Sequence, residues 1–212
     1  MIKSSEVDMK LYATELLHTE KSIPVFFDSF LSEKRFEEYK TACDKRKNEI
    51  LTGDKLIIYA VKTEYGIDAR GLVYKKHENG KPYFENVPFY FSLTHTDTLC
   101  AAAFCRNEIG IDAERVTEVK NRIFERVFSD GEKLYINHAK DRKRAFFEVW
   151  TAREAYLKYD GAGLLCKMSS FECDFQNHTV GGVPFLHFYI DENVICVVGA
   201  KEEIEIIKIP IV

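Results

Sequence analysis

"LCAAAFCRNEIGIDAERV" (residues 99–116) is the stretch of sequence that decides how the chain folds and where its chemistry lies. The apolar run over 99–111 predicts a strand, and side chains along a strand alternate between two faces. Asp112 and Glu114 end this run two positions apart, so we expect them to point the same way. Like charges held so close raise a carboxyl pKa unless a cation or a proton lies between them. The pair is therefore the first candidate for a functional site.

The segments on either side of this stretch predict a mixture of strands and helices. Extended segments are expected over 10–16 (at a sheet edge), 69–84 (two pieces joined by a turn at Asn79-Gly80), 88–96, 98–105, 170–175, 184–191, 194–200 and 204–209. Helices are expected over 32–66 (one on each side of Lys45–Lys47), 118–128, 130–140 and 141–159, the last ending at "DGAG" (160–163). This order predicts an α+β chain of two similar lobes, residues 1–107 and 108–212.

Composition argues against a secreted, membrane-spanning or nucleic-acid-binding protein. The chain has 212 residues, enough for a substantial core, and a net charge of −4, which gives no overall attraction to nucleic acid. Its N-terminus lacks a signal-peptide pattern, and no apolar run approaches the roughly 20 residues of a membrane span. The six cysteines form no CxxC pair, so we expect reduced thiols. These features predict a cytoplasmic protein that binds neither membrane nor nucleic acid.

A third carboxylate lies on the helix expected over 141–159. Glu154 and Lys158 are four residues apart and so lie on neighbouring parts of one helix surface. Three carboxylates without histidine or cysteine suit Mg²⁺ rather than Zn²⁺, and Mg²⁺ completes its shell with water and phosphate oxygens. If this helix meets Asp112 and Glu114, phosphoryl transfer or phosphodiester cleavage is implied. The alternative is an ordinary strand end and a surface ion pair.

Several motifs in order along the chain resemble those of the 4′-phosphopantetheinyl transferases of the larger, surfactin-synthetase-activating type. They are "KRKNEILTGD" (45–54), "GKPYF" (80–84), "FSLTHT" (91–96), "GIDAER" (110–115) and "WTAREAYLK" (150–158), followed by "DGAGL" (160–164). The resemblance implies two α/β lobes related by pseudo-twofold symmetry, with the active site in the cleft between them. It also implies Mg²⁺-dependent transfer of the 4′-phosphopantetheine arm of coenzyme A to a serine of an apo acyl or peptidyl carrier protein. Adenosine 3′,5′-bisphosphate is then released, and the enzyme works as a monomer.

The resemblance also assigns roles to single residues. The metal ligands would be Asp112, Glu114 and Glu154. Glu154 would also be the general base, directly or through a metal-bound water, and Lys158 would contact the transferring phosphate. Coenzyme A would be bound by Arg46 at its 3′-phosphate, by Thr94 and His95 at a phosphate, by Lys158, and by Lys81 and Pro82 along the nucleotide. Outside the motif, a lone histidine such as His95 would be interpreted as structural.

Two features qualify the resemblance. Arg153 stands where the family usually has lysine, so a contact in the pocket could change. Thr94 and Thr96 replace the usual serines but keep their hydroxyl groups. Neither change removes a metal ligand, so activity is still expected.

The segment Arg115–Phe128 is the expected docking surface for the carrier protein. It combines basic residues (Arg115, Lys120, Arg122, Arg126) with apolar residues at helical spacing (Val119, Ile123, Phe124, Val127). A basic rim around an apolar stripe would suit an acidic partner. The alternative is that the stripe packs on the core, as in most amphipathic helices.

Two other functions compete with the transferase. A Mg²⁺-dependent nuclease or phosphohydrolase could use the same carboxylates, but the chain lacks the basic stripe of a nucleic-acid enzyme. A protein that only binds coenzyme A would have no need for a costly cluster of negative charge.

Overall fold

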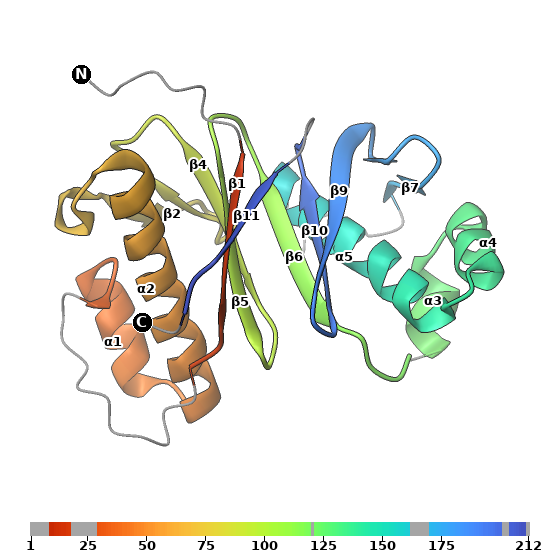
Figure 1. The fold of residues 1–212 in the computed structure, drawn as a ribbon, viewed down its shortest axis with the longest axis horizontal. Coiled ribbons are helices and arrows are strands. Elements are labelled where there is room, and N and C mark those ends of the chain that lie inside the picture. The colour runs from red at the N-terminus through yellow and green to blue at the C-terminus, as the bar shows by residue number, and fades with distance from the viewer. Residues whose placement is uncertain (1–8, 18–28, 120, 162–169, 201–203, 211–212) are drawn as a thin grey trace.

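The computed structural model describes residues 9–17, 29–119, 121–161, 170–200 and 204–210 (Figure 1). The helices are α1 (Glu33–Thr41), α2 (Asp44–Tyr65), the 3₁₀ turn η2 (Ala69–Gly71), α3 (Asn121–Val127), α4 (Asp130–His138) and α5 (Arg142–Asp160). The strands are β1 (Lys10–Glu15), β2 (Tyr74–Lys76), β3 (Pro82–Phe84), β4 (Tyr90–His95), β5 (Leu99–Cys105), β6 (Gly110–Arg115), β7 (Cys173–Asp174), β8 (Thr179–Val180), β9 (Val183–Ile190), β10 (Asn193–Val198) and β11 (Glu205–Lys208). The predicted α+β class is confirmed.

The described strands form two larger sheets and one two-stranded hairpin. The first sheet has the order β11-β1-β5-β4 and the second has the order β6-β10-β9-β8-β7, while β2 and β3 form a separate hairpin. β1 runs antiparallel to β5 and parallel to β11, with Leu11 opposite Ile206. The expectation that residues 10–16 form an edge strand is therefore wrong, because β1 lies between two partners. β11, which the sequence analysis placed in the second lobe, belongs to the first sheet.

The two sheets pack face to face, and each carries a long helix on its outer face (Figure 1). Successive side chains of a strand point to opposite faces of its sheet, and this alternation produces the layers. Leu11 and Ala13 of β1 face the second sheet, whereas Tyr12 faces α2. On the other side, Val194 and Cys196 of β10 pack beneath α5. The order of layers is thus α2, first sheet, second sheet, α5.

Helix ends follow the capping chemistry of the sequence. Ser32 and Asp141 cap α1 and α5 through their side chains, and Ser129 forms a capping box with Glu132 at α4. α5 ends at Asp160 and is capped by Gly161, whose left-handed φ of 73° favours glycine. The break between the first two helices comes earlier than expected, since α2 begins at Asp44 and Lys45–Lys47 lie in its first turn.

The run over 99–111 is two strands rather than one. β5 ends at Cys105 and β6 begins at Gly110, so Asp112 and Glu114 lie within a strand. Gly110 allows α5 to approach β6 closely: a Cβ there would lie only 2.0 Å from the Ala155 carbonyl oxygen. This close approach brings the second half of α5 to the carboxylates of β6.

Four of the described cysteines are buried and all five are free, while Cys166 lies outside the described residues. No helix in the described ranges is long and apolar enough to cross a membrane.

His187 of β9 makes the fold sensitive to acid. Burial lowers its pKa from 6.5 to about 4, against the opposing charge of Glu148. Between these values the unfolded chain binds a proton that the folded chain does not, so the free energy of unfolding falls as the pH drops from about 6.5 to about 4. At about 1.4 kcal/mol per pKa unit, the loss is of order 3 kcal/mol.

Denaturant unfolding at several pH values measures this slope. We expect His187→Gln to flatten it relative to the unsubstituted chain, and His138→Gln, an exposed histidine of α4, to leave it unchanged. An equal slope in all three chains would show that His187 does not carry the effect.

Candidate functional site

Asp112 is the centre of the candidate site. It projects from β6 toward α5, and its Oδ1 lies 2.7 Å from the Lys158 ammonium. The hydroxyl of Thr94 on β4 donates to the same oxygen at 3.3 Å and accepts from the Ala113 amide at 3.1 Å. The other oxygen, Oδ2, is buried and has no hydrogen-bond partner among the described residues. The site thus lies where β4, the edge of the first sheet, meets β6, the edge of the second.

Glu114 and Glu154 share the electrostatic environment of Asp112. Burial raises the pKa of Glu114, the charge of Asp112 raises it further, and the indole N–H of Trp150 opposes this by donating to Oε1 at 3.3 Å. Burial also raises the pKa of Glu154, again with Asp112 adding to it and Lys158 opposing it. The three carboxylates are therefore close enough to repel one another, and the charge of Lys158 acts against this repulsion at both glutamates.

The donor set fits a hard cation. No group of three or more His, Cys, Asp and Glu side chains among the described residues is already arranged to hold a metal ion. Mg²⁺, however, typically uses only one or two protein carboxylates and leaves the other positions to water and phosphate. The buried Oδ2 of Asp112, which has no partner in the described part of the chain, is such an oxygen ligand. A cation there would relieve the repulsion from Asp112, which adds to the effect of burial in raising both glutamate pKa values.

A second charged cluster lies beside the first, on the first-sheet side of the junction. His95 follows Thr94 on β4, and its Nε2 lies 3.4 Å from Oε2 of Glu49 on α2. Arg46, one turn earlier on α2, donates to the same oxygen at 3.1 Å. Burial lowers the pKa of His95, and the positive charges of Lys158, Arg46 and Lys45 act in the same direction, against Glu49. The structure thus brings the predicted residues Arg46, His95 and Lys158 into one region.

Lys81 and Pro82 lie at the β2–β3 hairpin. The Lys81 ammonium contacts Glu108 Oε2 at 2.6 Å and the carbonyl oxygen of Tyr159 at 3.0 Å, so it reaches the C-terminal end of α5. Pro82 begins β3 opposite Lys76. The hairpin therefore borders the end of α5 that carries Lys158.

Arg153 lies in the core, not in the pocket that the sequence analysis considered. Its side chain is 1% exposed and its Nε donates to Glu132 Oε1 of α4 at 2.9 Å, while Glu132 is 0% exposed. The guanidinium also lies over the rings of Phe128 and Phe171. Arginine here ties α5 to α4, on the side of the helix away from Asp112.

The predicted docking segment packs partly on the core. Val119, Phe124 and Val127 contact the apolar residues beneath α5, as the alternative interpretation required. Arg115 is bound to Glu192 and Asp97. Arg126 is exposed, whereas the placement of Lys120 and of the Arg122 and Ile123 side chains lies outside what the structure describes.

Two residues of the site were missed by sequence reasoning. Trp150 was not among the predicted site residues, although a partly buried indole N–H requires an acceptor. Glu49 was overlooked, although it follows Arg46 by three residues on a helix, a spacing that favours an ion pair.

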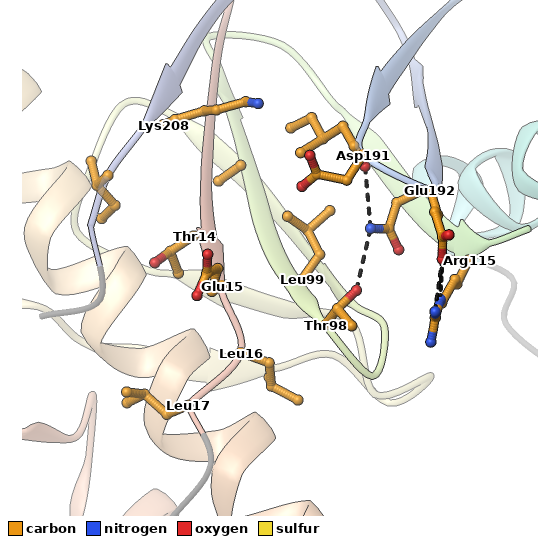
Figure 2. A pocket seen from close by; sticks show the side chains of 14 residues that line it. Thr14, Glu15, Leu16, Leu17, Thr98, Leu99, Arg115, Asp191, Glu192 and Lys208 are labelled. Carbon is orange, nitrogen blue, oxygen red and sulfur yellow. Dashed lines mark hydrogen bonds and ion pairs between the residues drawn. The ribbon is translucent and has the colours of Figure 1, made fainter.

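A cavity of about 980 Å³ lies apart from Asp112 and the other residues of the candidate site (Figure 2). It is lined by the end of β1, the start of β5, the turn between β9 and β10, and β11. Of the described residues that line it, none is a predicted metal, catalytic or cofactor residue. The candidate site is therefore distinct from this cavity.

Comparison with known proteins gives one consistent match. Residues 108–203, which include Asp112, Glu114 and Glu154, match the 4′-phosphopantetheinyl transferase superfamily. The chain is 30% identical to the 4′-phosphopantetheinyl transferase psf-1 of Bacillus pumilus over 148 residues (68% of this chain, 63% of the relative). It is 28% identical to the 4′-phosphopantetheinyl transferase Sfp of Bacillus subtilis over 149 residues (68% and 66%).

A third relative is the 4′-phosphopantetheinyl transferase gsp of Aneurinibacillus migulanus, 30% identical over 126 residues (58% of this chain, 53% of the relative). The chain thus spans between about half and two thirds of the length of these relatives.

Proposed function

We propose, from the match of residues 108–203 to the 4′-phosphopantetheinyl transferase superfamily and from the similarity of the chain to three transferases of that name, that the chain belongs to this superfamily. We propose further that it transfers the 4′-phosphopantetheine arm of coenzyme A to a serine of an apo acyl or peptidyl carrier protein. The observation that carries the proposal is Asp112, which lies in the matched region. Its Oδ1 contacts Lys158, and its buried Oδ2 has no partner among the residues that the structure describes. A carboxylate beside a lysine at a junction of two sheets suits a pyrophosphate held through a cation.

In the proposed reaction the carrier serine attacks the phosphorus that bears the pantetheine arm. A bond forms between the serine Oγ and this phosphorus, and the bond to the bridging pyrophosphate oxygen breaks, which releases adenosine 3′,5′-bisphosphate. Glu154 accepts the serine proton. Burial and the charge of Asp112 raise the pKa of Glu154, which makes its carboxylate a stronger base than an exposed glutamate.

Asp112, Glu114 and Glu154 are the residues proposed to hold Mg²⁺. When bound, Mg²⁺ would neutralise the pyrophosphate and stabilise the negative charge on the leaving bisphosphate. Lys158 then contributes a fixed positive charge for the transferring phosphate, because it already lies 2.7 Å from the Asp112 carboxylate. Trp150 orients Glu114 through its indole N–H.

The nucleotide end of coenzyme A is proposed to lie toward α2 and the β2–β3 hairpin. His95 and Arg46 would contact its phosphates, and Lys81 and Pro82 would line the nucleotide pocket. Thr94 contributes indirectly, since its hydroxyl is already engaged with Asp112 and the Ala113 amide.

The proposal extends to the architecture and the partner. Residues 1–107 and 108–212 would form two lobes related by pseudo-twofold symmetry, apart from β11, with the active site between them. One chain would then hold a complete site and work as a monomer. The carrier protein would dock near Arg115–Phe128, where Arg126 offers an exposed positive charge.

A mass measurement tests the proposed function. We expect incubation with an apo carrier protein, coenzyme A and Mg²⁺ to add the mass of one phosphopantetheine arm to the carrier, and EDTA to abolish the gain. A carrier panel covering fatty-acid, polyketide and nonribosomal-peptide types guards against choosing the wrong partner. Release of inorganic phosphate or cleavage of DNA, with no mass gain on any carrier, would point to the rival phosphoryl enzymes instead.

A further inference from the structure

Glu49 lies where two proposed ligands of the nucleotide end meet. Its Oε2 accepts a hydrogen bond from Arg46 Nη1 at 3.1 Å and lies 3.4 Å from His95 Nε2. The glutamate side chain is 9% exposed, whereas that of Arg46 is 41% exposed. A buried carboxylate between an arginine and a histidine opposes the binding of a phosphate to either of them.

The other carboxylate beside Arg46 acts in the same direction. Glu38 of α1 accepts from Arg46 Nη2 at 2.9 Å, so the guanidinium is held at both ends by acidic groups. Glu38 is itself held by Arg35 Nη1 at 3.1 Å, and Arg35 is fixed by the fully buried Asp54. Arg46 therefore belongs to a network of alternating positive and negative side chains, and its guanidinium is already held by ion pairs before any ligand binds.

A phosphate that approached Arg46 would have to compete with these carboxylates. It would lie within a few ångströms of Glu49, in a partly buried place where solvent screens the repulsion incompletely. We expect the repulsion between Glu49 and this phosphate to weaken the binding of the phosphate about tenfold or more. The remaining guanidinium N–H groups would recover part of this cost.

We propose that Glu49 is a specificity-determining residue. It cancels most of the affinity that the 3′-phosphate would otherwise contribute, so that this chain binds coenzyme A and 3′-dephospho-coenzyme A with nearly equal affinity. The inference rests on the proposed function, because it concerns how the same site treats the nucleotide end of its co-substrate. The pyrophosphate contacts at Asp112 and Lys158 are common to both compounds and do not contribute to the difference.

Titration calorimetry with the two compounds, in the presence of Mg²⁺ and without a carrier protein, tests this inference. We expect the two dissociation constants of the unsubstituted chain to agree within about threefold. In Glu49→Gln, which keeps the size and an acceptor for Arg46, coenzyme A should bind about tenfold tighter and 3′-dephospho-coenzyme A should be unaffected. The matched control is Glu37→Gln on α1, whose partner is Lys40, and it should behave as the unsubstituted chain.

The double variant Glu49→Gln/Arg46→Ala assigns the gain to Arg46, since the new preference for coenzyme A should disappear. A preference above about thirtyfold in the unsubstituted chain would overturn the inference. So would weaker binding of coenzyme A by Glu49→Gln, which would mean that Glu49 positions Arg46 for the phosphate. If neither compound binds the unsubstituted chain, the proposed function fails as well; if both bind and Glu49→Gln changes nothing, this inference alone fails.

Discussion

Asp112→Asn should lower the rate of transfer to a carrier protein by at least about 10²-fold. Asparagine has the same shape, so the fold should persist, but it loses the charge that pairs with Lys158 at 2.7 Å. It also presents a neutral side chain in place of the buried Oδ2, which has no partner within the described ranges, and amide groups are poorer ligands for Mg²⁺ than carboxylates. Initial rates from intact-carrier mass spectra, taken over a Mg²⁺ titration, measure the loss.

The matched control is Asp141→Asn at the N-cap of α5. The Asp141 side chain accepts from the Arg144 amide, and asparagine caps helices about as well as aspartate, so this variant should keep full activity. If Asp112→Asn melted at the temperature of the unsubstituted chain and still transferred at its rate, the carboxylate at 112 would have no part in the reaction. The proposed site would then have to be abandoned.

The largest loss of stability is expected from Arg153→Met. Methionine leaves Glu132 as an uncompensated charge in the core, where it is 0% exposed, and breaking a buried ion pair in this way costs about 3–5 kcal/mol. Glu132 would keep its hydrogen bonds from the Cys173 and Ser129 amides, which limits the loss. Denaturant unfolding gives the change in the free energy of unfolding.

Two further variants isolate the ion pair. Adding Glu132→Gln to Arg153→Met removes the charge and keeps an acceptor for the backbone amides, so it should recover a large part of the loss. Arg142→Met, at the exposed start of α5, should cost less than about 0.5 kcal/mol. A loss at Arg153 no larger than that at Arg142 would contradict the structural role, and a selective fall in coenzyme A affinity would return Arg153 to the pocket.

Local patterns in the sequence predicted the parts of the site that lie along single elements. Alternation along a strand puts Asp112 and Glu114 on one face of β6, and helical spacing puts Glu154 and Lys158 together on α5. The resemblance to a known family supplied what spacing alone could not, namely that these two elements meet. Gly110, which lets them come so close, is the first letter of the same motif.

Contacts between distant elements could not be predicted in this way. Arg153 looks like a pocket residue next to Glu154, but its direction is decided by Glu132, 21 residues earlier on another helix. β11 has an apolar pattern that fits either sheet, and only the complete fold decides that it lies beside β1. The partner of a strand is a property of the whole chain, because a strand pattern specifies a face and not a neighbour.

The pairing of β1 with β11 determines when the first sheet can form during synthesis. A ribosome makes β1 long before β11, yet these strands lie side by side with Lys10 opposite Glu205. Until Lys208 has left the ribosome, one side of β1 presents unpaired backbone groups, a template on which other chains can add. The first sheet is therefore complete only after all the residues between β1 and β11 have been made, and a fragment that ends after β5 would expose this edge permanently. We expect such fragments to aggregate, and the nascent protein to depend on chaperones or on a rapid final pairing step.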